Sequence, residues 1–187
     1  MSPQLNLSFK PFPILQTQRL LLREIIPSDA GDLFTLRSSS EVMKHIDRPR
    51  ATTIDDAKKL IQLFDEILSK GEGINWGVSL KDNNKLLGNI CLWKIQIENC
   101  RAEVGYLLDT SVWRKGIMNE ALQAVVNYGF NTMGLHSIEA IINPDNIGSA
   151  KLLEKNGFVQ EAYFKENYYY DGKFRDTAAY SKLSTNQ

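Results

Sequence analysis

The sequence predicts an α/β (α+β) domain in which strands and helices follow one another in the order β-α-α-β-β-β-α-β-α-β-β. Two patterns carry this prediction. Apolar residues recur every three or four positions over 117–133, as expected for one face of a long amphipathic helix. Short segments such as 102–108 and 136–143 combine apolar and β-branched residues between polar turns, which is typical of strands. One domain is expected over residues 1–187, because a chain of 187 residues with 43% hydrophobic content can bury its own core.

The boundaries of these elements come from proline, glycine and capping residues. Three prolines disfavour regular structure in residues 1–16, which are expected to form an irregular lead-in. Thr53 and Asp56 resemble a helix-capping pair, and Asp171 with Gly172 is typical of a tight turn. The predicted strands are 19–25, 74–80, 86–95, 102–108, 136–143, 158–165 and 173–183, the helices are 27–39, 53–70, 117–133 and 146–156, and loops are expected at 42–51 and 81–85.

Composition argues against several classes of partner. Lys and Arg number 22, as do Asp and Glu, so no global charge favours nucleic acid or an anionic membrane. Cys91 and Cys100 are expected to be reduced and structural, and no His/Cys cluster has metal-ligand spacing, so no metal is expected. No apolar run is long enough to span a bilayer, and residues 1–10 do not resemble a signal peptide, so we expect a cytoplasmic protein. The sequence leaves open whether the chain forms a homodimer.

The most specific stretch is RAEVGYLLDTSVWRKGIMNEA, residues 101–121. A strand there turns through a basic loop into a helix, and a helix N-terminus presents unpaired backbone N–H groups that can bind an anion such as pyrophosphate. Gly116 allows close approach of the backbone, while Arg114 and Lys115 add positive charge. The loop matches neither the G-x-x-x-x-G-K-S/T nor the G-x-G-x-x-G pattern. A simple helix-capping turn remains an equal alternative on these residues alone.

These residues resemble the GNAT N-acetyltransferases, in particular the branch of ribosomal-protein N-terminal acetyltransferases (RimJ/RimL type). AEVGYLL and W-R-K-G-I-M-N-E-A are similar to that branch, with Arg114 where it often has glycine. The resemblance implies a mixed, mostly antiparallel sheet flanked by helices, with acetyl-CoA placed where two neighbouring strands part. It also implies that the loop and helix start hold the pyrophosphate and that two strand residues meet the pantetheine arm by backbone: Arg114, Lys115, Gly116, Ile117, Met118 and Asn119 in the first group, Leu107 and Leu108 in the second.

A second motif begins at Asn143 and continues to Phe158. Taken alone, its Asn, Asp and Ser residues are good helix N-caps. It also resembles the N-x-x-S followed by L-E-K-x-G-F of the same family branch. The resemblance implies that Asn143 and Asn146 bind the cofactor and that the Ser149 hydroxyl protonates the leaving thiolate.

Aminolysis of a thioester requires a group that accepts a proton from the amine. Glu103 is the candidate base, acting directly or through water, and Glu98 in the preceding turn is a second choice. The alternative is that Glu103 only pairs with a neighbouring cation. Many members of the family use a tyrosine as acid, but Tyr163 lies beyond the last predicted helix, so Ser149 is preferred.

The sequence therefore predicts an enzyme that moves acetyl from acetyl-CoA to a primary amine by direct attack, without an acyl-enzyme. The acceptor stays open between a protein N-terminus and a small amine. The residues that select it are expected in 42–51, in the second helix and in 168–173. A non-catalytic acyl-CoA-binding or interaction protein on the same fold is the alternative.

Overall fold

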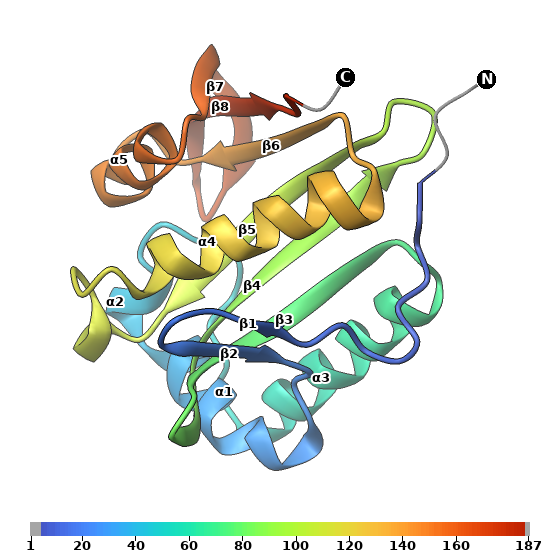
Figure 1. The fold of residues 1–187 in the computed structure, drawn as a ribbon. Helices are drawn as coiled ribbons and strands as arrows, with labels where there is room; N and C mark the ends of the chain where they lie inside the picture. Colours follow the sequence, from blue (N-terminus) through green and yellow to red (C-terminus); the bar gives the residue numbers. More distant parts are fainter. Residues whose placement is uncertain (1–4, 186–187) are drawn as a thin grey trace.

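The computed structural model describes residues 5–185, and in this part of the chain one sheet of eight strands runs in the order β1-β2-β3-β4-β5-β6-β8-β7 (Figure 1). Neighbouring strands are antiparallel except β5 and β6, which are parallel. The strands are β1 (Leu15–Gln16), β2 (Leu20–Arg23), β3 (Gly73–Leu80), β4 (Asn83–Gln96), β5 (Arg101–Leu108), β6 (Ser137–Ile142), β7 (Val159–Tyr170) and β8 (Lys173–Leu183). The α-helices are α1 (Ala30–Ser38), α2 (Ser40–Met43), α3 (Ile54–Ser69), α4 (Ile117–Tyr128) and α5 (Ile147–Lys155). The mixed, mostly antiparallel sheet and the order of its main elements agree with the prediction.

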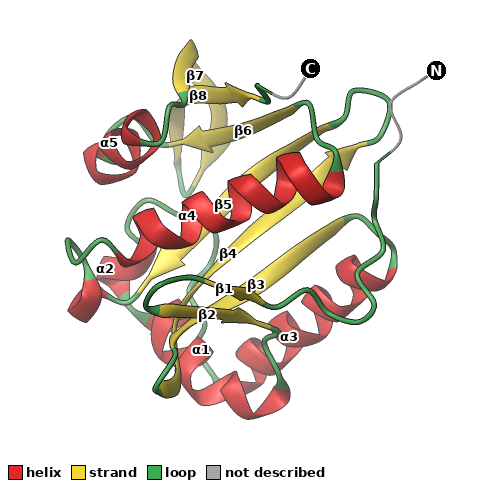
Figure 2. Cartoon of the chain, in the orientation of Figure 1, coloured by secondary structure: helices red, strands yellow, loops and turns green. Residues whose placement is uncertain are grey.

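Helices pack on both faces of this sheet, and α4 crosses in front of β4 and β5 (Figure 2). On the α4 face, the core contains fully buried side chains from the central strands and from the helix stripe: Leu22, Trp76, Ile90, Leu92, Ala121, Leu122 and Val125. On the opposite face, α1 and α3 cover a second cluster that includes Leu33, Leu36, Ile61, Leu86 and Leu107. Because successive strand residues point to opposite faces, each central strand contributes alternate side chains to the two clusters.

Several boundaries differ from the sequence prediction, among them the end of β7, which runs to Tyr170 and not to residue 165. The lead-in includes the two-residue strand β1, while residues 1–4 lie outside the described part of the chain. The segment 42–51 is not wholly a loop, since Ser39 caps α2 by accepting a hydrogen bond from the Val42 N–H. Strand β4 begins at Asn83, so the 81–85 loop is a shorter turn. Helix α4 ends at Tyr128, and five residues of π-helix, Gly129–Met133, continue it to Gly134, whose φ of 80° terminates the helix.

Strand β6 lies between β5 and β8 in the sheet. The predicted turn at Asp171 and Gly172 connects β7 to β8, and both residues have positive φ. Between residues 5 and 185, no helix combines the length and the apolar character that crossing a bilayer would require.

Candidate active site

Strands β5 and β6 pair only at one end. Their register joins Arg101, Ala102 and Glu103 to Ser137, Ile138 and Glu139, and no further pairs follow although β5 runs on to Leu108. The Arg101 guanidinium reinforces the paired end by donating to Glu139 at 2.9 Å, Ser137 at 3.2 Å and Ser181 of β8 at 3.1 Å. Beyond Glu103 the two strands part, and we call this opening the splay. Splayed strands leave backbone groups free to bind a ligand.

At the splay, the backbone N–H and C=O groups of successive β5 residues point alternately toward β4 and toward the opening. The Asp109 N–H donates to the Leu87 carbonyl at 2.8 Å, on the β4 side. Since alternate residues of an antiparallel strand bond the same neighbour, the backbone groups of Leu107 also face β4, whereas those of Tyr106 and Leu108 face the splay. The Leu108 carbonyl accepts a hydrogen bond from the Trp113 indole at 2.8 Å. The geometry therefore favours Tyr106 over Leu107 as a backbone contact for a ligand in the splay.

The predicted anion-binding loop leads directly from β5 into α4. Gly116 is the N-cap of α4, with a φ of 75° and no side chain to accept hydrogen bonds from the first turn. Arg114 also has a left-handed backbone, with a φ of 60°. Glycine, which the resembling family branch often has at position 114, adopts this conformation without strain, whereas an arginine adopts it at some cost. The Lys115 carbonyl is held by the Arg19 guanidinium at 3.0 Å, which fixes the loop against the N-terminal segment.

The first turn of α4 keeps its N–H groups available. Its one acidic residue, Glu120, turns away from them: it accepts hydrogen bonds from Thr17 and from the backbone and side chain of Arg19. Ile117 and Met118 bury their side chains in the core, so only their backbone can face a ligand. The positive end of the helix dipole and uncapped N–H groups together favour an anion at this point.

Helix α5 begins on the other side of the splay and is capped as the sequence suggested. The Asn146 carboxamide oxygen accepts from the Ser149 N–H at 3.1 Å, and the Asn143 side chain accepts from the Asp145 N–H at 2.8 Å. Among the described residues, the Asn146 amide nitrogen has no protein acceptor. Capping and ligand binding can therefore use different atoms of the same side chain. Asn119, by contrast, uses its side-chain oxygen to accept from Asn156 at 3.1 Å, which ties α4 to the end of α5.

Ser149 has a partner that the sequence did not reveal. Its hydroxyl lies 2.5 Å from the Tyr106 hydroxyl, and the contact joins β5 to α5 across the splay. Ser149 is 6% exposed, and burial raises the pKa of Tyr106 to about 12, so the phenol keeps its proton at neutral pH. Only the place of Tyr106 within the AEVGYLL motif could have drawn attention to it, because its partner is 43 positions away.

Glu103 lies at the point where the splay begins and is 7% exposed. It pairs with Lys94 at 2.7 Å, so the neighbouring cation considered in the sequence analysis is present. Burial raises the pKa of Glu103, and Lys94 opposes that effect. Since Glu103 and Tyr106 are three residues apart on one strand, their side chains point to opposite faces of the sheet.

The two alternative proton-transfer residues lie elsewhere. Glu98 is exposed in the turn between β4 and β5. Tyr163 is 53% exposed on β7, and its hydroxyl donates to Asp176. Neither side chain contacts Ser149 or Glu103 in the described structure.

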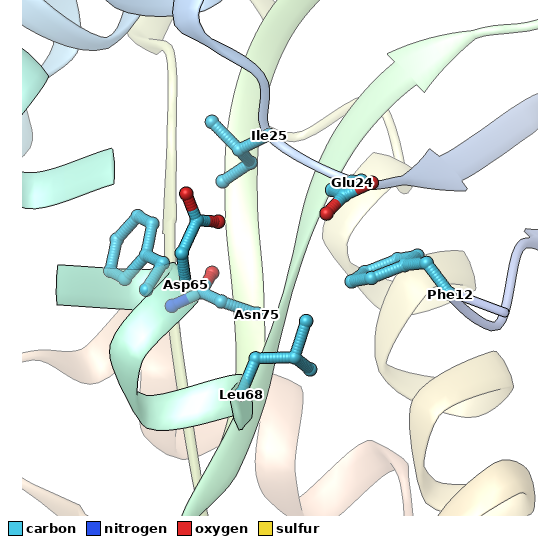
Figure 3. A pocket seen from close by; sticks show the side chains of 7 residues that line it. Phe12, Glu24, Ile25, Asp65, Leu68 and Asn75 are labelled. Carbon is cyan, nitrogen blue, oxygen red and sulfur yellow. The ribbon is translucent and has the colours of Figure 1, made fainter. Parts of the chain in front are cut away.

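Two hollows lie away from the splay. A cavity of about 10 Å³, which is room for roughly one water molecule, lies beside β2, β3 and α3, where Phe12 and Glu24 face Asp65, Leu68 and Asn75 (Figure 3). A groove of about 330 Å³ lies between the second half of α4 and the end of β8. Neither is lined by Glu103 or Ser149, so the splay remains the candidate active site.

Comparison with known proteins decides the family, since residues 19–159 match the family model of the acetyltransferase (GNAT) domain. The chain belongs to the GNAT acetyltransferase family. An uncharacterized N-acetyltransferase of Bacillus subtilis (strain 168), YoaA, is 36% identical to this GNAT chain over 170 residues, covering 91% of this chain and 96% of the relative. A solved GNAT-family acetyltransferase from Bacillus anthracis is similar with a TM-score of 0.81 and 29% identity, covering 91% of this chain and 98% of the other.

A structure of RimL, a ribosomal L7/L12 α-N-protein acetyltransferase in complex with coenzyme A, gives a TM-score of 0.85. Its identity is 22%, with 94% of this chain and 100% of the other covered, so this likeness shows the fold alone. The resemblance identified in the sequence is thus confirmed at the level of family and fold. The protein is an acetyltransferase, and GNAT acetyltransferases use acetyl-CoA.

Proposed function

We propose that this GNAT enzyme transfers the acetyl group of acetyl-CoA to a primary amine by direct attack in a ternary complex. The observation that carries the proposal is the end of β5–β6 pairing at Glu103. This break gathers free backbone groups, a buried carboxylate and a buried hydroxyl pair around one opening. Cys91 lies beside the opening, where its thiol donates to the Gly105 carbonyl at 3.4 Å. Burial raises the pKa of this thiol to about 12, so it is a poor nucleophile, which is consistent with transfer that needs no acyl-enzyme.

The residues at the splay fit acetyl-CoA. The N–H groups of the segment 114–119 would hold the pyrophosphate, because they surround an uncapped helix start. The backbone of Leu108 and the free amide of Asn146 would meet the pantetheine arm, with Tyr106 replacing Leu107 on the β5 side. When bound, acetyl-CoA supplies an activated thioester carbonyl.

Two proton movements are assigned to opposite sides of the splay. Glu103, on the face covered by α1 and α3, accepts a proton from the incoming amine, and its raised pKa makes it a better base than a solvated carboxylate. In this assignment Ser149 would direct its hydroxyl toward the departing sulfur, and Tyr106, whose hydroxyl lies 2.5 Å away, would donate to the Ser149 oxygen. A hydrogen bond from Tyr106 strengthens Ser149 as a donor. The proton acceptor Glu103 and the proton donor Ser149 thus do not compete for space.

The ion pair between Glu103 and Lys94 is the observation that favours an alternative in which Glu103 is structural and another group accepts the proton of the amine. A carboxylate in a structural ion pair would leave turnover unchanged when it is replaced. A catalytic carboxylate would not.

Thiol release from acetyl-CoA in the presence of an amine panel separates the two. We expect Glu103→Gln to lower kcat/KM about 10²- to 10⁴-fold, as for loss of a general base, and Ser149→Ala to lower it about tenfold or less. Coenzyme A affinity, measured by calorimetry, should be retained in both variants. Glu98→Gln is the matched control and should behave as the parent. Thiol release that is unchanged in Glu103→Gln would support the structural role of Glu103.

A further inference from the structure

In the described structure, three arginines lack a carboxylate partner near the face of the splay to which Glu103 points, where Arg48 lies over Trp93, the register partner of Glu103. We call them the arginine cluster: Arg37, Arg48 and Arg175. They come from α1, from the loop between α2 and α3, and from β8. Within residues 5–185, none of the three lies within 4.0 Å of a carboxylate. Arginines without partners are unusual at a partly buried site, because a desolvated cation costs free energy unless it is paired.

Arg37 is the clearest case of a buried cation without a carboxylate partner. Its Nε is buried and has no hydrogen-bond partner in the described structure, while Nη1 reaches only the Met43 sulfur at 3.6 Å. Burial lowers the pKa of Arg37, and repulsion from Arg48 adds to the effect. The two guanidinium groups are thus close enough to repel each other.

Arg48 places the cluster beside the candidate base. Its guanidinium lies 5.4 Å from the centre of the Trp93 ring, and Trp93 is paired in register with Glu103. Arg48 itself is exposed, so it can be reached by a ligand. An arginine stacked on an aromatic ring is held in place with its donors still available.

Arg175 extends the same surface from β8. Its Nε is also buried without a partner in the described structure. Arg175 is paired in register with Tyr168, whose hydroxyl donates to Asp47, the residue next to Arg48. The two nearby carboxylates are therefore both engaged, Asp47 by Tyr168 and Glu103 by Lys94.

We propose that the amine acceptor carries an anionic oxygen group, a carboxylate or a phosphate, which binds Arg37 and Arg48 beside Trp93 while its amine faces Glu103. The proposal rests on the proposed function, since it names the acceptor class of the same site. Guanidinium groups match both anions, because each presents paired oxygens to a planar fork of N–H donors. A polyamine would meet the cluster with like charge and is disfavoured.

Acceptors that differ only in the anionic group test this. In the thiol-release assay we expect alanine to exceed alaninamide, and ethanolamine phosphate to exceed ethanolamine, by about tenfold or more in kcat/KM. The two pairs also tell a carboxylate acceptor from a phosphate acceptor. Arg48→Gln should remove most of the preference by lowering kcat/KM for the anionic acceptors alone, and Arg48→Lys should restore part of it. Arg50→Gln, an exposed arginine of the same loop that donates only to the Ser38 carbonyl, is the control.

A binding measurement keeps this test separate from that of the proposed function. N-acetylalanine and N-acetylalaninamide are titrated against tryptophan fluorescence, and Trp93→Phe identifies the signal of Trp93. Saturable change with the carboxylate, absent in Arg48→Gln, supports the proposal even if no amine is acetylated. Equal binding of both compounds, or preferred turnover of the neutral or polyamine acceptors, would overturn it. Binding of neither compound, together with no preference for ethanolamine phosphate over ethanolamine, would overturn it as well.

Discussion

The two sides of the splay are built from different parts of the chain. The loop that leads into α4 is continuous, from Trp113 to Asn119, and offers backbone N–H groups around one glycine. The arginine cluster is assembled from three distant segments and offers side chains. A site made of backbone depends on φ and on helix geometry, whereas a site made of side chains depends on residue identity. We therefore infer that the first side serves a common cofactor and that the second sets what is particular to this protein.

The acid limb of the rate profile provides the largest expected effect. Burial raises the pKa of Glu103, so the base loses its charge, and the rate falls, on acidification through that pKa. Lys94→Met removes the cation that opposes this shift, so the limb should move to higher pH while the plateau at high pH is kept. The profile of kcat/KM against pH measures this. The Glu103→Gln variant should have no such limb, and a limb that does not move in Lys94→Met would assign it to another group.

The raised pKa of Glu103 also predicts how the free energy of unfolding depends on pH. A carboxyl with a raised folded-state pKa contributes stability below its unfolded pKa, and this contribution is lost as pH rises through the folded-state pKa. At neutral pH, Glu103→Gln should therefore not lower the free energy of unfolding, while it abolishes most activity. Urea unfolding at pH 5 and pH 8 measures the difference. Lys94 is 56% exposed, so leaving it unpaired adds little cost.

The proposed anion site at the start of α4 is disrupted most directly by a substitution at Gly116. Gly116→Val forces a β-branched residue to a φ of 75° and places its Cβ 3.4 Å from the Arg19 guanidinium. Such strain is of the order of 1–3 kcal/mol, so we expect coenzyme A to bind about 10- to 100-fold more weakly by calorimetry. Gly172→Val is the matched control, because it has a φ of 77° and open space in the β7–β8 turn. If both variants kept full affinity, the α4 start would not be the anion site.

The sequence predicted the elements of the α4 loop side correctly because their signal is local, while the role of this side in cofactor binding stays a prediction. The strand, the basic loop, Gly116 and the stripe of α4 lie within one short stretch, and the caps of α5 follow the same logic. The shortening of α4 by its π-helical end was not foreseen, since the apolar spacing continues through Phe130 and Met133.

For the arginine cluster, the sequence predicted only the segments involved and not the individual residues. The sequence named 42–51, the second helix and 168–173 as the segments that select the acceptor, which stays a prediction. Arg48 and the bond from Tyr168 to Asp47 belong to the first and the third, while α3 supplies none of the three arginines. The sequence did not name Arg37, Arg175 or Tyr106. Their roles depend on which residues the sheet brings together, and pairing across distant strands is not encoded by any local pattern. The register that sets Trp93 beside Glu103 is of this kind.

Asn146 provides the smallest expected effect and the sharpest test of the comparison, because its side chain is proposed to bind a pantetheine arm that is otherwise met by backbone groups of β5. Its oxygen caps α5, while its amide nitrogen is free of protein acceptors in the described structure. Asn146→Ser keeps a good cap but loses the amide donor. We expect a free energy of unfolding within about 0.5 kcal/mol of the parent and a KM for acetyl-CoA about 2- to 10-fold higher. Asn146→Ala should lose about 1 kcal/mol as well, because it removes the cap. If serine restored both stability and KM, the residue would act as a cap alone and the cofactor side would be backbone throughout.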